Sequence, residues 1–371
     1  MKISIITMHR IVNYGSVLQA YATQYIFEKM GCETEIIDYQ TKRMTMTGMI
    51  RDIKEKNDLL KKSLLIRTAV RIIMIPSYLK RFPVFKRFVS NNLKISKHLY
   101  TCEEDFEKYP LETDLLVTGS DQVWNSDVSN GIDRPFYFSF DDTKEKIAFS
   151  ASFGKSKLKD EEKKEIHLLL SKYKAISVRE KSGIEILENL GLKGQWILDP
   201  TLLLTKEEWA PFISERYSNK KYILVYNINR EKGLDKFVRR LEKAKKIPVY
   251  FLSYQWHDFY KHGKLKCCPA VEDFLGLIKS AEYVVTDSFH CLAFSIVFNK
   301  QVMPYYPHKF STRLASLVEL IGLQKQVITE NATVEIADNK IEWDKISKRL
   351  ANEKKNTLKW LENAIISSIE K

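Results

Sequence analysis

The sequence is poor in cysteine, glycine and proline, and it contains no long apolar run. Its 371 residues include 13 Gly, 10 Pro and five Cys, which are Cys32, Cys102, Cys267, Cys268 and Cys291. Because the cysteines are odd in number and show no C-x-x-C spacing, we expect no disulfide framework, no structural zinc site and a reducing compartment. No stretch of about 18 uninterrupted apolar residues occurs, so we expect no membrane span.

Three further signals are missing. The N-terminus lacks the length and cleavage site of a signal peptide, which predicts a cytoplasmic protein. No G-x-G-x-x-G fingerprint is present, so a dinucleotide is not indicated. No set of His, Cys and carboxylate residues has metal-ligand spacing, so we expect neither a metal nor another cofactor.

What is present is a globular composition with 44% hydrophobic and 29% charged residues. A chain of this length is too long for one ordinary core and fits two domains of roughly 150–200 residues. A strand at 2–9, a helix at 17–30 and a strand at 35–39 form a β-α-β unit, so the first sheet begins parallel. Further strands are expected at 114–118, 146–151, 175–178, 196–198, 221–228, 247–253, 283–287 and 302–306. Further helices are expected at 158–172, 180–190, 232–245, 271–280, 290–299, 312–321 and 343–369.

The break at Asp199-Pro200 divides this alternation into two series. We therefore predict an α/β protein with two Rossmann-like, doubly wound domains, residues 1–200 and 201–342, that face a cleft, followed by a C-terminal helix at 343–371. Ligands bind beyond the carboxyl ends of the strands in such sheets, so the loops there are the candidate sites.

Positive charge is concentrated at 42–108, which we predict to be a basic helical insertion in the first domain. The net charge is +13, and residues 41–100 alone carry 15 basic and three acidic residues. Basic, aromatic-rich amphipathic sequence suits an anionic membrane surface or a lipid-linked substrate, so peripheral attachment at the inner face of the cell membrane is one interpretation. A helix that buries its apolar stripe beneath a solvated basic face is the alternative. Nucleic acid is not expected as a partner, because no recognised nucleic-acid motif accompanies the charge.

Two loops of the first series carry candidate binding residues. After the first strand, Asn13, Gly15 and Ser16 can present backbone N–H groups to an anion at a helix N-terminus, although a tight turn with a helix cap has the same pattern. The second loop follows the strand at 114–118 and contains Ser120, Asp121, Gln122 and Trp124. Asp121 can accept a proton or orient a sugar hydroxyl, and Trp124 offers a flat face to a sugar ring; an Asx turn with a packed Trp is the alternative.

Two further loops carry a guanidinium and an imidazole. Arg179, at a strand end, can fork onto a phosphate or carboxylate, or it can pair with an acid such as Glu180. Ser288 and His290 stand at a strand-to-helix turn of the second series. With an unperturbed pKa near 6.5, His290 can donate and accept protons at neutral pH, although a lone His often satisfies only a local hydrogen bond. Cys291 follows in an apolar helix and is expected to be a buried thiol.

These loops, in this order, resemble the polysaccharide pyruvyltransferase family. The resemblance spans roughly residues 1–325 without the basic insertion. Its pieces are Asn13-Tyr14-Gly15-Ser16-Val17-Leu18-Gln19, Gly119-Ser120-Asp121-Gln122-Val123-Trp124, Ser152-Phe153-Gly154, Ser177-Val178-Arg179-Glu180, Asp199-Pro200-Thr201 and Thr286-Asp287-Ser288-Phe289-His290. The family in turn is similar in fold to GT-B glycosyltransferases, which have two facing Rossmann-like domains.

The resemblance implies transfer of the enolpyruvyl-derived group of phosphoenolpyruvate onto two sugar hydroxyls, with a pyruvate ketal and phosphate as products. By this resemblance His290 protonates the enol carbon, Arg179 binds the anionic donor, and Asp121 deprotonates or orients the acceptor hydroxyl. Better-studied members have Arg-Leu-His where this chain has Ser288-Phe289-His290, so one anion-binding cation is missing. Arg313, Lys309 or His308, in the loop after the next strand, are candidates to replace it, and Ser288 would also suit a less charged donor.

Three functions follow as hypotheses. The first is a pyruvyltransferase of surface polysaccharide biosynthesis, with phosphoenolpyruvate and a sugar or lipid-linked oligosaccharide as partners. The second is a GT-B glycosyltransferase that uses a nucleotide sugar, although no convincing acid pair for the nucleotide is found in the second series. The third is a membrane-attached scaffold without enzymatic activity, suggested by the basic insertion.

Overall fold

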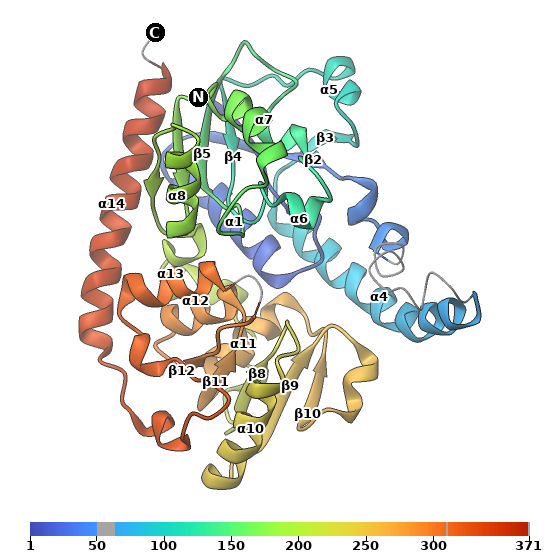
Figure 1. The fold of residues 1–371 in the computed structure, drawn as a ribbon, viewed down its shortest axis with the longest axis vertical. Coiled ribbons are helices and arrows are strands. Elements are labelled where there is room, and N and C mark those ends of the chain that lie inside the picture. Colours follow the sequence, from blue (N-terminus) through green and yellow to red (C-terminus); the bar gives the residue numbers. More distant parts are fainter. Residues whose placement is uncertain (50–63, 309–310, 370–371) are drawn as a thin grey trace.

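The computed structural model describes residues 1–49, 64–308 and 311–369, and it contains two α/β domains, each built on a parallel sheet (Figure 1). The N-terminal sheet has seven strands in the order β3-β2-β1-β4-β5-β6-β7. They are β1 (Lys2–Ile6), β2 (Glu33–Tyr39), β3 (Ile95–Tyr100), β4 (Leu115–Thr118), β5 (Glu145–Ala151), β6 (Ala175–Val178) and β7 (Gln195–Trp196). The order reverses between β1 and β4, which creates a switch point where ligands bind in doubly wound sheets.

The C-terminal sheet repeats this plan with five parallel strands in the order β10-β9-β8-β11-β12. They are β8 (Ile223–Tyr226), β9 (Val249–Ser253), β10 (Lys264–Cys267), β11 (Tyr283–Thr286) and β12 (Gln301–Pro304). Its switch point lies between β8 and β11. β4 and β8 are completely buried, as expected for short apolar runs covered on both faces by helices.

Helices connect the strands of both sheets. Those of the N-terminal domain are α1 (Tyr14–Lys29), α4 (Leu64–Asn92), α5 (Glu104–Lys108), α6 (Ser126–Ser129), α7 (Asp160–Leu170) and α8 (Lys181–Asn189). The others are α9 (Lys206–Trp209), α10 (Lys232–Lys245), α11 (Val271–Ser280), α12 (Phe289–Val297), α13 (Thr312–Ile321) and α14 (Trp343–Ile369). The fold class predicted from the sequence is therefore confirmed.

The segment expected to be a helical insertion is only partly helical, and residues 50–63 of it lie outside the described chain. α4 is a helix, but β3 pairs in parallel with β2, from Ile36 opposite Ile95 to Tyr39 opposite Tyr100. α4 is thus the crossover between two strands of the sheet. The prediction missed β3 because an edge strand that carries Lys97 and His98 lacks the apolar run of a central strand.

Apolar packing joins the two domains. Tyr14, at the start of α1, extends into the C-terminal domain, where its ring stacks on Phe274 and Tyr254 with centroid distances of 4.3 and 5.4 Å. α14 runs beside both domains in Figure 1, and its Thr357 accepts a hydrogen bond of 3.2 Å from the backbone N–H of Leu198. These contacts hold the two switch points in a fixed relation to each other.

Candidate active site

A cavity of about 200 Å³ lies where the switch points of the two sheets face each other. The loops after β1 and β4 form one wall, and the loops after β8 and β11 with the start of α13 form the other. The lining residues are Met8, Ile11, Asn13, Ser16, Asp121, Gln122, Val128, Ile228, Asn229, Asp287, Ser288, Phe289, His290, Arg313 and Leu314. Polar side chains of both domains therefore share one small space.

Three helices begin at this cavity, and a residue from the start of each lines it: Asn13 for α1, Ser288 for α12 and Arg313 for α13. Asn13 caps α1 by accepting a 2.9 Å hydrogen bond from the N–H of Gly15, and Ser288 caps α12 by accepting one of 3.4 Å from Cys291. A helix N-terminus has unpaired N–H groups and a partial positive charge. Three such ends around one cavity favour an anionic ligand.

His290 lines the cavity from the C-terminal domain and is 7% exposed. Its ring lies so close to Gly15 that a Cβ added there would be 1.9 Å from His290 Nδ1. Glycine at this position of α1 therefore makes room for the imidazole of the other domain. Within the described chain His290 Nε2 has no hydrogen-bond partner, and it lies 3.9 Å from Asp199 Oδ2. Burial lowers the pKa of His290 to about 4, although Asp199 acts in the opposite direction, so the ring is neutral at pH 7.

Asp121 lines the cavity from the N-terminal domain. Its Oδ2 accepts a 2.6 Å hydrogen bond from Ser16 Oγ, and its Oδ1 lies 3.1 Å from Nη2 of Arg179. Burial raises the pKa of Asp121, but Arg179 and His290 lower it by a larger amount, so that the pKa falls to about 2. Its backbone has a φ of +78°, a conformation that is strained for a residue with a side chain and that the surrounding contacts must hold in place. Asp121 is therefore an ionised, firmly held carboxylate and a weak proton acceptor at neutral pH.

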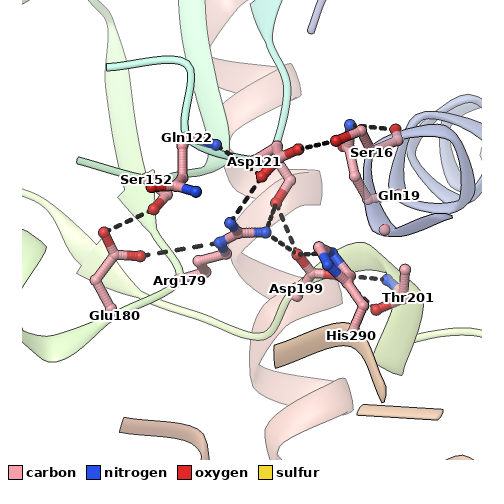
Figure 2. A network of polar contacts seen from close by, with 12 residues as sticks. Ser16, Gln19, Asp121, Gln122, Ser152, Arg179, Glu180, Asp199, Thr201 and His290 are labelled. Carbon is pink, nitrogen blue, oxygen red and sulfur yellow. Dashed lines mark hydrogen bonds and ion pairs between the residues drawn. The ribbon is translucent and has the colours of Figure 1, made fainter. Parts of the chain in front are cut away.

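Arg179 lies beneath the cavity wall, not on it, and its side chain is fully buried. Its Nη1 is 2.8 Å from Asp199 Oδ2, its Nη2 contacts Asp121, and its Nε is 3.9 Å from Glu180 Oε2 (Figure 2). The prediction that Arg179 binds an anionic ligand in bidentate fashion is corrected. Both ends of its guanidinium are already paired with protein carboxylates, because a buried cation must be paired. Arg179 positions Asp121 instead of facing the cavity.

The buried carboxylate of Glu180 accounts for the Ser152-Phe153-Gly154 motif. Its carboxylate accepts a hydrogen bond of 2.9 Å from Ser152 Oγ (Figure 2). It also accepts hydrogen bonds of 2.9 and 3.0 Å from the backbone N–H groups of Phe153 and Gly154. Gly154 has a φ of +62°, which a residue with a side chain rarely adopts. The Ser152-Phe153-Gly154 motif is thus a cradle for a buried carboxylate and ties the end of β5 to the end of β6.

Arg313 is the guanidinium that reaches the cavity. In the described parts of the chain it forms no ion pair, and its Nε has no hydrogen-bond partner. Burial and the nearby guanidinium of Arg179 lower the pKa of Arg313 to about 10, so it is still charged at neutral pH. His308 is exposed and pairs with Glu231 outside the cavity, at 2.6 Å. Lys309 lies outside the described residues.

Two predicted binding residues belong to the protein interior. Trp124 is 1% exposed and stacks on Tyr137 at a centroid distance of 5.5 Å, so it offers no face to a sugar ring. Ser120 is completely buried, and its Oγ donates to Asp199 Oδ2 at 2.8 Å. Both expectations are corrected, because a polar loop after a central strand also has to fill the space between that strand and the helices. Gln122, in contrast, lines the cavity as expected.

Asn229 and Ile228 line the cavity but were not predicted. Their loop is held by Asp287, whose carboxylate accepts hydrogen bonds of 2.7 and 2.8 Å from the N–H groups of Ile228 and Asn229. Their position in the sequence could have indicated this role, because their loop follows β8, the first strand of the second series, just as the Asn13 loop follows β1.

No three His, Cys or acidic side chains of the described residues are grouped so that they could hold a metal ion. In the same part of the chain, no helix combines the length and apolar character needed to cross a membrane.

Comparison with solved structures places the fold. MnaA from S. aureus, solved with UDP, is 12% identical with a TM-score of 0.51, and the match covers 94% of this chain and 90% of that one. A UDP-GlcNAc 2-epimerase from Methanocaldococcus jannaschii, solved with UDP-GlcNAc and UDP, is also 12% identical with a TM-score of 0.51, covering 95% and 92%. At this identity the likeness shows a GT-B-like fold alone.

Comparison of sequences is more specific. No curated protein sequence matches the chain significantly. Residues 13–309, however, match the family model of the polysaccharide pyruvyl transferases, a stretch that begins at the cap of α1 and includes His290. By fold, by the loops at the two switch points and by this match, the chain belongs to the polysaccharide pyruvyl transferase family.

Proposed function

We propose that the chain forms a pyruvate ketal on a lipid-linked sugar, with phosphoenolpyruvate as the donor. One observation carries the proposal: within the described residues, an imidazole whose Nε2 has no hydrogen-bond partner and a guanidinium without an ion pair share a small cavity with three helix N-termini. A phosphorylated enol carboxylate needs a proton donor at its double bond and positive charge around its anionic groups. His290 and Arg313 are the residues of the cavity that meet these needs.

The cavity size favours a small donor. Sites for drug-sized ligands measure about 300–1,000 Å³, whereas this cavity measures about 200 Å³. A compact three-carbon phosphate suits it better than a nucleotide sugar does. Supporting charge comes from Arg313 and the ends of α1, α12 and α13, since Arg179 is already neutralised by Asp121 and Asp199.

The chemistry is a balanced sequence of two additions. His290 takes up a proton when the anionic donor binds and donates it to C3 of the donor, which makes C2 an oxocarbenium-like centre, and the first acceptor hydroxyl adds to C2. The C2–O bond to phosphate then breaks, and the phosphate leaves with the electron pair. The second hydroxyl adds to C2 and completes the ketal. Of the two hydroxyl protons lost, one restores the imidazolium and one leaves with the phosphate.

Replacing Arg313 by methionine tests donor binding. Because a hydrogen bond to a charged group contributes about 1.5–3 kcal/mol, we expect the Kd for phosphoenolpyruvate to rise roughly 10- to 100-fold. The Kd is measured by the thermal shift of the protein with increasing phosphoenolpyruvate, because a ligand of the native state raises its stability.

His308→Ala is the matched control, since His308 stands near Arg313 in sequence but outside the cavity. Its Kd should equal that of the wild type. A panel of UDP, ADP, GDP and CMP sugars is titrated in parallel. Stabilisation by a nucleotide sugar but not by phosphoenolpyruvate would contradict the proposal and favour the glycosyltransferase alternative.

We also propose that α4 and the 3-10 helix η6 (Trp256–Tyr260) contact an anionic membrane that carries the acceptor. Four apolar residues of α4 recur at helical spacing and are 39–84% exposed, namely Leu65, Ile72, Ile75 and Leu79. η6 adjoins α4, because Lys80 lies 4.8 Å above the Trp256 ring, and it exposes Phe259 and Tyr260 by 77% and 68%. The basic excess of residues 41–100 complements an anionic surface.

Replacing Phe259 and Tyr260 together by serine should weaken binding to phosphatidylglycerol vesicles by more than tenfold, because the burial of each aromatic ring contributes about 1.5–3 kcal/mol. Co-sedimentation with vesicles measures the effect, and turnover on a water-soluble acceptor should be unchanged. Leu168→Ser, at an apolar residue 55% exposed on α7, is the control. Equal vesicle binding by the wild type and the double variant would refute this surface.

A further inference from the structure

A second, much larger cavity adjoins the candidate active site. It measures about 800 Å³ and lies beyond the carboxyl ends of β2 and β3. Its walls come from the segments 39–43, 101–104 and 127–135. Val128 lines both this cavity and the active-site cavity, so the two are neighbours across one side chain. The backbone carbonyl of Val128 accepts a hydrogen bond from Arg43, which ties this residue between the two cavities to the loop after β2.

A third cavity, of about 520 Å³, continues on the far side of the same segment. It shares Asp127, Asn130, Gly131 and Ile132 with the large cavity. Residues 126–135 are therefore a common wall from the active site to the surface of α7.

The large cavity has the polar chemistry of a hydroxyl-binding site. Its lining contains three cationic residues (Lys42, Arg43 and Arg134) and four acidic ones (Glu103, Glu104, Asp127 and Asp133). Such mixed charge does not select an anion.

Two lining hydroxyls, Thr41 Oγ1 and Ser129 Oγ, are buried without a hydrogen-bond partner in the described structure. Rotation of these two side chains toward a ligand that supplies donors and acceptors would satisfy both hydroxyls, because each unpaired buried group costs free energy.

The small active site cannot hold both the donor and a whole oligosaccharide. We propose that the large cavity binds a neutral oligosaccharide, namely the sugar units of the acceptor that precede the reacting unit. This inference rests on the proposed function, because the reacting unit must reach His290 past Val128. A cavity at the upper end of the range for small-molecule sites accommodates more than one sugar unit.

Cys102 provides a direct probe, since it lines this cavity and is exposed, whereas Cys267, Cys268 and Cys291 are buried. The wild-type protein is treated with fluorescein maleimide, and modification of Cys102 is followed by peptide mass spectrometry. Ladders of one to four units of glucose, galactose and N-acetylglucosamine are added. The longer members of at least one ladder should slow Cys102 modification about tenfold at ten times their Kd, and the monosaccharide should not.

A double variant, Thr41→Val with Ser129→Ala, serves as the second measurement. Loss of two hydrogen bonds of about 0.5–1.5 kcal/mol each should raise the concentration needed for protection roughly 5- to 150-fold. Cys102→Ser confirms which thiol is followed. If no ladder member protects Cys102, or if monosaccharides protect as well as tetrasaccharides, the inference is wrong. Phosphate release from phosphoenolpyruvate, measured in the same samples, reports on the proposed function independently.

Discussion

Replacing His290 by alanine is expected to lower the rate of ketal formation by roughly 10²- to 10⁴-fold, the usual contribution of a general acid. The imidazole lines the cavity, its Nε2 has no hydrogen-bond partner in the described structure, and it is neutral before the donor binds. Loss of the ring therefore removes the proton donor without removing a charge from the free enzyme. Initial rates with labelled phosphoenolpyruvate measure the effect, and the Kd for the donor should change much less than kcat.

Donor binding should be coupled to proton uptake by His290. The pKa of this residue is about 4 in the unliganded protein, and an anion placed beside the ring raises it. A base that gains a proton on binding makes affinity fall as the pH rises from the pKa of the free protein toward the higher pKa of the complex. The Kd for phosphoenolpyruvate should therefore increase between pH 6 and pH 8 in the wild type. Phosphoenolpyruvate also titrates near pH 6, so the diagnostic result is a shallower pH dependence in His290→Ala.

Gly15→Ala offers a second test of the same imidazole, because the new Cβ would occupy the place of His290 Nδ1. Displacement of a catalytic group by about 1 Å can cost 10²-fold in rate. The double variant Gly15→Ala with His290→Ala should be no slower than His290→Ala alone, since both changes act on one group. Full activity of either single variant would remove His290 from the mechanism.

Replacing Arg179 by methionine is expected to lower the free energy of unfolding by about 3–5 kcal/mol, because it leaves buried carboxylates without their counter-ion. Asp121 and Asp199 lie 3.1 and 2.8 Å from the guanidinium, and the Arg179 side chain is fully buried. Urea unfolding at pH 7.5 measures the loss. Arg134→Met is the matched control, since Arg134 is 50% exposed and its ion pairs should contribute no more than about 1 kcal/mol.

The effect of Arg179→Met should also depend on pH in a defined direction. In the wild type the pKa of Asp121 is lowered to about 2. Its contribution to the free energy of unfolding is therefore complete above its unfolded pKa of about 4 and is lost as the pH falls toward 2. Without Arg179, burial raises the pKa of this carboxyl. The difference between variant and wild type should therefore shrink from pH 7.5 to pH 4. A difference independent of pH would contradict the pairing.

The fold was predictable because most strands are short apolar runs between amphipathic helices. β3 and β10 were missed because both are outer strands of their sheets and carry charged or polar residues at exposed positions, Lys97 and His98 in β3 and Lys264 in β10. An edge strand needs only one partner, so its sequence is less constrained than that of β4 or β8.

The site was predictable in position more than in role. His290, Asp121 and Arg313 could be placed at the cavity because loops after parallel strands meet at one edge of a sheet. The roles of Gly15 and Arg179 depend on what lies across from them, the ring of His290 in one case and two carboxylates in the other. Such long-range contacts leave no local pattern in the sequence.

The most direct test of the account is the fate of the proton at C3 of the donor. The protein is incubated in D2O with phosphoenolpyruvate and a lipid-linked oligosaccharide extract, and the ketal is examined by mass spectrometry and NMR. If protonated His290 delivers the proton, the ketal methyl group carries one deuterium, one phosphate is released per ketal, and His290→Ala forms neither product at a comparable rate. Phosphoenolpyruvate that stays intact with every acceptor fraction, or a ketal methyl group without deuterium, would contradict the account.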